Sequence, residues 1–131
     1  QHCTQLFKRP LFWFAVPAIA FGLSHAYADP SSTASMVAYV VWTSAFALAA
    51  IDLTARTGSL GAAWGFHMAV NVTAMMVATQ QNATMSAAAL FLFPESPGGD
   101  ALPTSFLVIS MIFELAFLFV LWLAARNAIH R

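Results

Sequence analysis

Four long runs of apolar residues, separated by short polar segments, dominate the pattern along the chain. These runs cover residues 11–28, 34–53, 59–79 and 104–125. A helix that crosses a bilayer needs about 20 mostly apolar residues, and each run comes close to that length. The pattern therefore predicts an all-α fold, a polytopic transmembrane helix bundle of about four spans.

The segments between the runs carry turn signals. "ADPSS" separates the first two runs and "RTGS" the second and third, where Gly58 suits a helix end and Ser59 a helix start. Between the last two runs, "SAAALFLFPESPGGDALP" holds a short apolar piece and a loop broken by proline and glycine. No repeat or linker divides the chain, so residues 1–131 are expected to form a single membrane domain.

The composition agrees with a membrane protein. Of the 131 residues, 60% are hydrophobic and 8% are charged, whereas a soluble domain would have roughly a quarter of its residues charged. The net charge is zero and no basic patch suits nucleic acid. Cys3 is the only cysteine, which excludes an internal disulfide and argues against a thiolate metal site. Membrane lipid is an expected partner, and nucleic acid is not.

The basic residues all fall on one side of the predicted bundle. Lys8 and Arg9 precede the first run, Arg56 lies between the second and third, and Arg126 and Arg131 follow the fourth. The other two connections carry acidic residues only. By the positive-inside rule, both ends of the chain are expected in the cytoplasm. The short loops and the charge asymmetry suit a bacterial inner membrane.

Few strongly polar side chains lie deep within the runs: His25, His67, Asn71 and Glu114. His67 and Asn71 are four residues apart, so a helix presents them on one face, one turn from each other. The same face also carries Leu60, Ala63, Trp64 and Ala74. Because a polar group in hydrocarbon is costly unless it is satisfied, the pair is expected in the bundle interior. There it either forms hydrogen bonds between helices or performs chemistry.

Three further features predict local structure. Gly61 and Gly65 form a G-x-x-x-G pair, which permits another helix to pack closely. Pro17 would kink or interrupt the first helix. Asp52 and Arg56 are spaced for an ion pair at the end of the second.

Metal and haem chemistry find little support among these residues. The sequence has no H-E-x-x-H pattern, and two histidines with one asparagine are too few good ligands for a closed zinc site. No cofactor is expected, with a divalent metal such as zinc as the alternative. Haem ligation by a histidine pair across two helices rests on the two histidines alone. Glu114 would stay protonated, pair with a histidine or act as a base, because a charged carboxylate is costly at that depth.

"FGLSHA" followed by "RTGSLGAAWGFHMAVN" resembles two of the three motifs of the CPBP family, the CAAX-protease and bacteriocin-processing intramembrane proteases. Phe21 and His25 match the family's F-x-x-x-H motif, and His67 and Asn71 match its H-x-x-x-N motif. The "TGSL" turn before the second motif is also typical. The resemblance covers roughly residues 1–75, and the helix at 104–125 is additional.

The resemblance implies an intramembrane endopeptidase that hydrolyses a peptide bond at or near the membrane. Its substrates would be prenylated C-terminal tails in eukaryotic or archaeal relatives, and peptide maturation or bacteriocin immunity would suit a bacterial one. A glutamate of the family's E-E-x-x-x-R motif would be the general base that, with His25, activates a water, while His67 and Asn71 would bind the developing oxyanion. That motif is absent here, so the chain is expected to be a C-terminal portion that is inactive alone.

Two other interpretations stay open. The chain could be a non-enzymatic membrane bundle or transporter fragment whose polar residues only pack helices together, or Glu114 could supply the missing carboxylate. A site shared by His25 and His67 also requires both residues at a similar depth in the membrane, and their positions along the two runs differ. At about 1.5 Å per residue, His25 lies about 21 Å along the first run from Leu11, and His67 about 12 Å along the third from Ser59. The sequence does not predict the oligomeric state.

Overall fold

The computed structural model describes residues 9–26, 32–80, 88–93 and 103–129, and most of them are helical. The helices are α2 (Pro10–Ser24), α3 (Thr33–Thr57), α4 (Leu60–Val72) and α5 (Thr104–Ile129). A π-helical turn, η1 (Thr73–Val77), continues α4, and the short strands β1 (Ala78–Gln80) and β2 (Phe91–Phe93) pair in parallel. The predicted all-α bundle is confirmed, and the strand pair is the part of the fold that the apolar pattern did not indicate.

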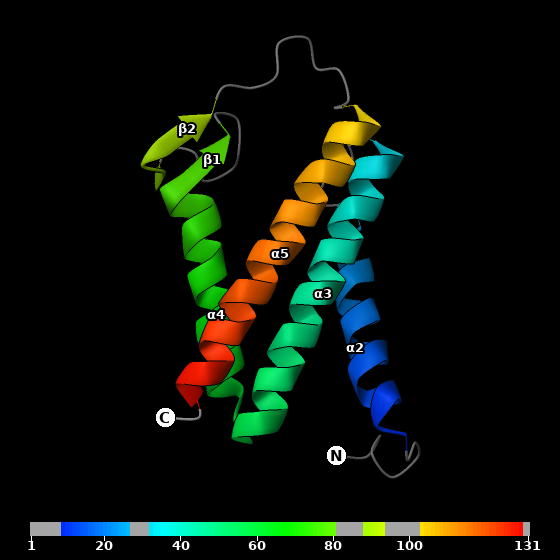
Figure 1. Ribbon diagram of the computed structural model, residues 1–131, viewed down its shortest axis with the longest axis vertical. Coiled ribbons are helices and arrows are strands. Elements are labelled where there is room, and N and C mark those ends of the chain that lie inside the picture. The colour runs from blue at the N-terminus through cyan, green and yellow to red at the C-terminus, as the bar shows by residue number, and fades with distance from the viewer. Residues whose placement is uncertain (1–8, 27–31, 81–87, 94–102, 130–131) are drawn as a thin grey trace.

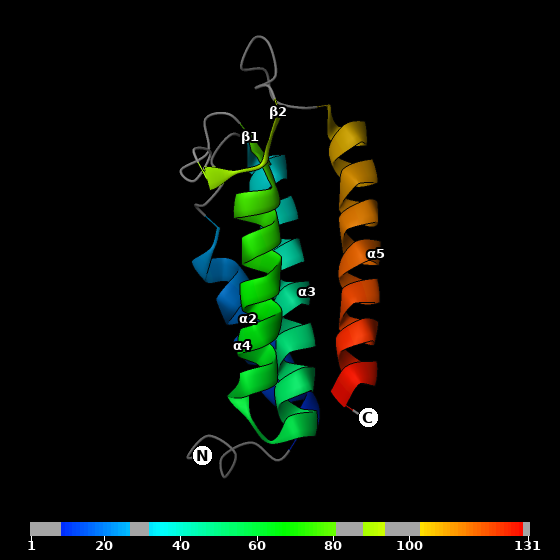
Figure 2. The same ribbon diagram turned by 90° about the vertical axis from the view of Figure 1, so that its left-hand side faces the viewer.

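The long helix α3 is the centre of the bundle, because α2, α4 and α5 each pack against it. Figure 1 shows α3 between α2 and α5, and Figure 2 shows α5 running along one side of the group formed by the other three helices. A small core of Phe46, Leu53, Phe66 and Leu118 joins α3, α4 and α5. Outside this core, most large apolar side chains on the described helices are exposed, as suits a surface covered by lipid.

Three helical segments of the described chain are long and apolar enough to cross a membrane: Thr33–Thr57, Leu60–Val77 and Thr104–Ile129. The predicted first span, 11–28, is shorter than expected, since α2 ends at Ser24 and residues 27 and 28 lie outside the described part. Its 15 residues rise only about 22 Å, less than the ~30 Å of a bilayer core. The third span ends at Val77 rather than Thr79, because the backbone there turns into β1.

The turn between α3 and α4 forms as the "RTGS" signal predicts. Gly58 ends α3 with a φ of 65°, the left-handed conformation that glycine adopts without strain. Ser59 then starts α4, and its hydroxyl accepts a hydrogen bond from the Gly61 amide at 3.1 Å. The Thr57 hydroxyl, which donates to the Ser59 carbonyl at 2.9 Å, closes the turn. This geometry fixes where α4 begins and therefore the depth of its polar residues.

The close helix contact occurs at Gly22, not at the G-x-x-x-G pair. A Cβ atom at Gly22 would overlap the Ser44 hydroxyl and lie 2.8 Å from the Val40 carbonyl oxygen, so α2 and α3 approach each other at this point. A Cβ at Gly65 would meet no atom within 4 Å, and one at Gly61 only the neighbouring Ser59. The close packing that the pair permits is therefore not made in the described chain, where Gly65 lines a cavity between α4 and α5 instead.

The basic residues gather at one end of the molecule. Arg9 precedes α2, Arg56 lies in the last turn of α3, and Arg126 lies near the end of α5. In Figure 1 these three helix ends lie together at the bottom of the bundle. Lys8 and Arg131 fall outside the described residues. We call this the basic end of the bundle.

Candidate active site

A cavity of about 500 Å³ lies between α2, α3 and α4. His67 lines it together with the face of α4 that carries Leu60, Ala63 and Trp64. Other lining residues are Trp13, Phe14, Pro17 and Phe21 of α2, and Phe46, Ala47, Ala50, Ile51, Thr54 and Ala55 of α3. The cavity runs from His67 toward the start of α4, and its lining is mostly aromatic and aliphatic. It offers an apolar surface that leads to one imidazole.

His25 lies at the C-terminal end of α2, where it completes the last turn of the helix. Its Nδ1 donates to the Phe21 carbonyl oxygen at 2.8 Å, which fixes the proton on Nδ1 in the neutral imidazole. The Ser24 hydroxyl donates to the same carbonyl at 2.7 Å. The i, i+4 spacing of the F-x-x-x-H motif is thus the spacing at which a side chain can reach a carbonyl left free at a helix end. This arrangement leaves Nε2 of His25 with its lone pair available.

The Phe21 ring packs against both histidines. Its ring centroid is 4.4 Å from that of His25 and 6.3 Å from that of His67, against which it packs edge-on. No hydrogen bond or direct ring contact joins His25 to His67 among the described residues. Pro17 does not interrupt α2, which is helical throughout. The motif phenylalanine therefore brings the two histidines into one neighbourhood without any break in the helix.

His67 is more exposed than the sequence predicted. It packs against Phe46, with ring centroids 5.2 Å apart, yet its side chain is exposed and makes no hydrogen bond within the described chain. The expectation that His67 lies buried in the bundle interior is wrong for the described chain. The physical reason is that α2 and α4 both pack on α3, while the cavity between them stays open on its remaining side.

Asn71 lies one turn beyond His67, in the last turn of α4 before η1. Both residues are in the same α-helix, so the predicted one-face arrangement holds. Asn71 is half-buried and is not among the residues that line the cavity. Its carboxamide has no hydrogen-bond partner in the described part of the chain. No described residue therefore competes for its hydrogen bonds.

Glu114 of α5 does not line the cavity that contains His67. It lines two smaller cavities, one with Ser35, Tyr39 and Ser110 and another with Val70. His25 and His67 line neither of these cavities. The central helix α3 contributes Trp42 to both.

Within the described ranges, no group of three or more histidine, cysteine, aspartate or glutamate side chains is placed to hold a metal ion. The residues present could offer one imidazole nitrogen each from His25 and His67, and Asn71 could add a carboxamide oxygen. That set holds only two of the usual zinc ligands, because the third group is a neutral carboxamide and not a histidine, cysteine or carboxylate.

Two aromatic residues of α3 contribute to the neighbourhood although the sequence did not single them out. Phe46 packs against Phe21, His67 and Phe66, and the ring centroid of Tyr39 lies 6.4 Å from that of His25. Phe46 stands in the apolar segment "SAFALAA", which gives it no distinguishing signal. Tyr39 carries a hydroxyl within an apolar run, and that feature could have identified it.

A family model described as type II CAAX prenyl endopeptidase Rce1-like matches residues 2–73, more than half of the chain. The matched region contains α2, α3 and all of α4, and with them His25, His67 and Asn71. α5 lies beyond it. No curated protein and no solved structure matches the chain.

Proposed function

The chain belongs to the type II CAAX prenyl endopeptidase Rce1-like family, and on that basis we propose that its His25, His67 and Asn71 form part of an intramembrane proteolytic site. At the family level it is an integral membrane protein and a CAAX-type protease, with peptide or protein substrates. The observation that carries the proposal is the position of Phe21, whose ring packs against both histidines. Residues from two motifs far apart in the sequence thus meet beside one cavity.

His25 is the proton carrier in this proposal. Because its Nδ1 donates to the Phe21 carbonyl, Nε2 is the nitrogen able to accept a proton. A water held between Nε2 and a carboxylate would give a proton to Nε2 as its oxygen attacks the scissile carbonyl carbon. The same proton would then pass to the leaving amine as the peptide bond breaks, which completes a hydrolysis.

His67 and Asn71 stabilise the oxyanion in this proposal. Both side chains can donate hydrogen bonds from one helix, and neither has a hydrogen-bond partner among the described residues that would compete. The carbonyl oxygen gains negative charge as the water attacks, and donors fixed on a helix stabilise that charge without rearrangement. Loss of one such donor costs about 2.7–4 kcal/mol of transition-state stabilisation in well-studied hydrolases.

The proposed reaction also needs a carboxylate, and this sequence lacks the E-E-x-x-x-R motif that provides it in the family. We propose that a glutamate of the E-E-x-x-x-R type is required and that the chain by itself does not cleave. Glu114 is a poor substitute, because it lines cavities on the α5 side that do not include either histidine. We propose that the reaction is metal-free.

We also propose that the chain lies in a bacterial inner membrane with both of its ends in the cytoplasm. The placement of the basic residues at one end of the bundle supports this orientation.

The test is a cleavage assay on a membrane-embedded preparation that contains the E-E-x-x-x-R segment, with the printed chain alone as the baseline. His25→Ala and His67→Ala should each reduce the cleavage rate at least about 100-fold, since each removes a group that acts on the reacting atoms. Both variants should still insert into the membrane. Activity within a few-fold of the unmodified protein in either variant would remove that histidine from the proposed site.

Two control variants separate catalysis from packing. Ser24→Ala removes the other side-chain donor to the Phe21 carbonyl, so it should leave cleavage within a few-fold if His25 does more than complete the helix end. Glu114→Gln should also retain activity. A loss in Glu114→Gln as large as in His25→Ala would instead identify Glu114 as the missing carboxylate.

A further inference from the structure

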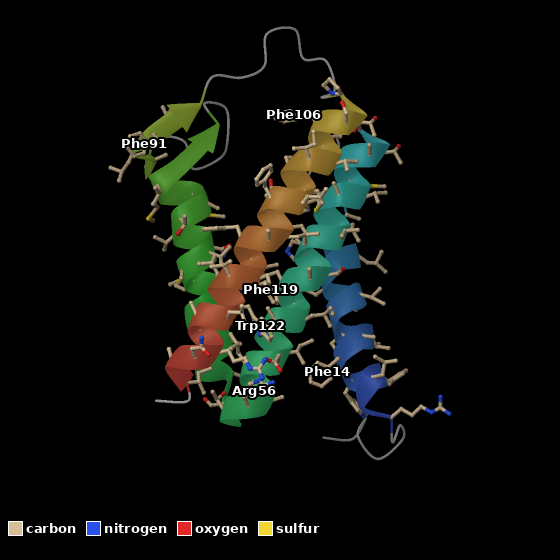
Figure 3. The ribbon with its side chains drawn as sticks, in the orientation of Figure 1. Phe14, Arg56, Phe91, Phe106, Phe119 and Trp122 are labelled. Atoms are coloured by element: carbon tan, nitrogen blue, oxygen red, sulfur yellow. The ribbon has the colours of Figure 1, made fainter. Side chains whose placement is uncertain are left out.

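A groove of about 350 Å³ lies between α3 and α5, and neither His25 nor His67 lines it. Each helix lines it with residues at i, i+3, i+4 and i+7, so that one stripe of each helix faces the other. The stripes are Ala45, Leu48, Ala49 and Asp52 on α3, and Leu115, Leu118, Phe119 and Trp122 on α5, with Phe14 of α2 beside them. Figure 3 shows Phe119 and Trp122 on the side of α5 that faces α3. The groove extends about 10 Å along the helices.

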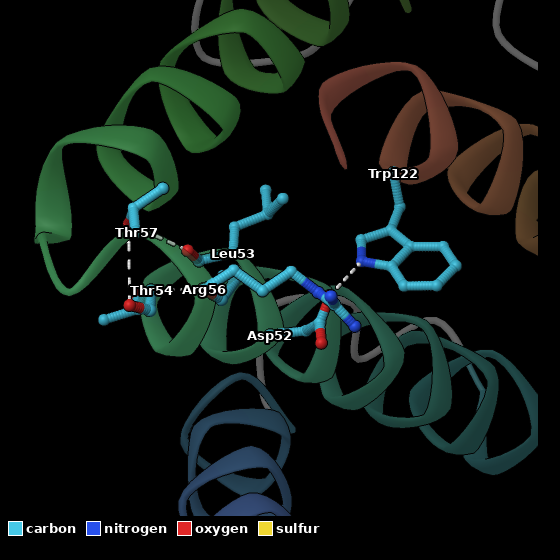
Figure 4. Close-up of polar contacts among 7 residues, drawn as sticks. Asp52, Leu53, Thr54, Arg56, Thr57 and Trp122 are labelled. Carbon is cyan, nitrogen blue, oxygen red and sulfur yellow. Dashed lines mark hydrogen bonds and ion pairs between the residues drawn. The ribbon is translucent and has the colours of Figure 1, made fainter. Parts of the chain in front are cut away.

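The groove changes from apolar to polar at the basic end of the bundle. There the Trp122 indole donates from α5 to Oδ2 of Asp52 on α3 at 3.0 Å. Nε of Arg56 donates to the same oxygen at 2.8 Å, which confirms the predicted ion pair (Figure 4). Arg126 lies over the Trp122 ring, with Cζ 5.2 Å from the centroid. Arg56 and Arg126 therefore lie one helical turn beyond the hydrogen-bonded pair of Asp52 and Trp122. Their two positive charges exceed the single negative charge of Asp52.

Donors remain free on both arginines. Asp52 engages only Nε of Arg56, and the two Nη atoms of Arg56 make no hydrogen bond within the described ranges. Arg126 stacks on Trp122 without an ion pair to any described residue. A guanidinium presents its donors in a plane that matches the oxygens of a phosphate. The polar end of the groove can thus bind an anion without disrupting the contact between α3 and α5.

We propose that this groove binds an anionic phospholipid, with the phosphate at Arg56 and Arg126 and part of an acyl chain along the apolar stripes. The order of groups matches the order in a lipid, since the charged end lies where the basic residues gather and the apolar part leads toward the middle of the helices. Leu48 and Phe119 at the rim are 42% and 55% exposed, so the groove opens to the surrounding bilayer. Basic pockets between transmembrane helices are known to hold anionic headgroups. This inference is independent of the proposed proteolytic site.

The experiment is a lipid titration of the complete chain in detergent micelles, followed by native mass spectrometry. Phosphatidylglycerol and phosphatidylcholine with identical acyl chains are compared, together with soluble glycerol phosphate. The chain should retain phosphatidylglycerol at least about five-fold more tightly than phosphatidylcholine. Arg126→Gln should lower that preference about five-fold, and the double variant Arg56→Gln with Arg126→Gln should abolish it. Arg9→Gln, at the same end but outside the groove, should retain it.

Several outcomes would overturn the proposal. Equal binding of the two lipids by the unmodified chain would do so without any variant, so the test does not depend on a variant folding. A loss in Arg9→Gln as large as in Arg126→Gln would assign the preference to general surface charge. Displacement of phosphatidylglycerol by equal concentrations of glycerol phosphate would indicate an anion site without a lipid groove. If Arg126→Gln is not recovered folded, Arg56→Gln replaces it and should lower the preference about five-fold, and an unchanged preference in that variant would overturn the proposal.

Discussion

At the scale of single residues, Phe21 accounts for most of the candidate site. Its carbonyl oxygen fixes His25 at 2.8 Å, and its ring packs against both His25 and His67. The sequence indicated Phe21 only as the first letter of a motif. The structure adds a physical reason for the four-residue spacing, because the imidazole at that spacing reaches the free carbonyl at the end of α2.

Asn71 allows a residue-scale prediction about the transition state. In the active preparation described above, Asn71→Ala should lower kcat about 100- to 1000-fold and change KM little, since its hydrogen bond would form chiefly to the developing oxyanion. Asn71→Asp keeps the size of the side chain but loses the donor, so it should be equally impaired. Steady-state kinetics check both variants. A raised KM with normal kcat would show that Asn71 binds substrate instead.

At the scale of elements, the position of α2 depends on a glycine that no motif singled out. Gly22 is buried against α3, where any Cβ would meet Ser44 and the Val40 carbonyl. Gly61 and Gly65 have the better-known pattern but no helix against them in the described chain. The sequence could not distinguish these cases, because a G-x-x-x-G pattern reports that close approach is permitted and not which helix approaches.

Replacement of Gly22 should therefore destabilise the bundle more than replacement of Gly65. Gly22→Ala should lower the free energy of unfolding by about 1–3 kcal/mol, the usual cost of an overpacked contact. Gly65→Ala has open space and a better helix former, so it should be neutral or stabilising by up to about 1 kcal/mol. Thermal unfolding in one detergent compares the two. Equal destabilisation would show that another helix packs on Gly65 of α4 after all.

At the scale of the whole molecule, α5 packs against the region matched by the family model, residues 2–73, through contacts in the core and at the surface. Leu118 joins the apolar core with Phe46, Leu53 and Phe66. Near the basic end, Trp122 bonds Asp52 across 70 residues of sequence. The sequence predicted Asp52 as one half of a local pair with Arg56, and the structure shows that the same carboxylate oxygen also anchors α5.

A double-mutant cycle between Asp52→Asn and Trp122→Phe should measure this anchor. The coupling free energy should be about 1 kcal/mol, in the range of hydrogen bonds between membrane helices. Phe119→Leu with Asp52→Asn is the matched pair, because Phe119 lines the same groove without bonding Asp52. That pair should be additive within about 0.5 kcal/mol. Coupling of equal size in both pairs would mean that the effect comes from general packing of α5.

The sequence by itself determined the helices, the turn at Gly58 and Ser59, the shared face of His67 and Asn71, and the gathering of basic residues at one end. These features follow from local chemistry: apolar length, the left-handed freedom of glycine, hydroxyl capping and helical spacing. The tertiary structure alone decided that Phe21 links the two histidines, that Gly22 is the close contact, that Asp52 holds α5 and that His67 faces an open cavity. Each of these depends on which helix faces which, and residues far apart in the chain decide that together.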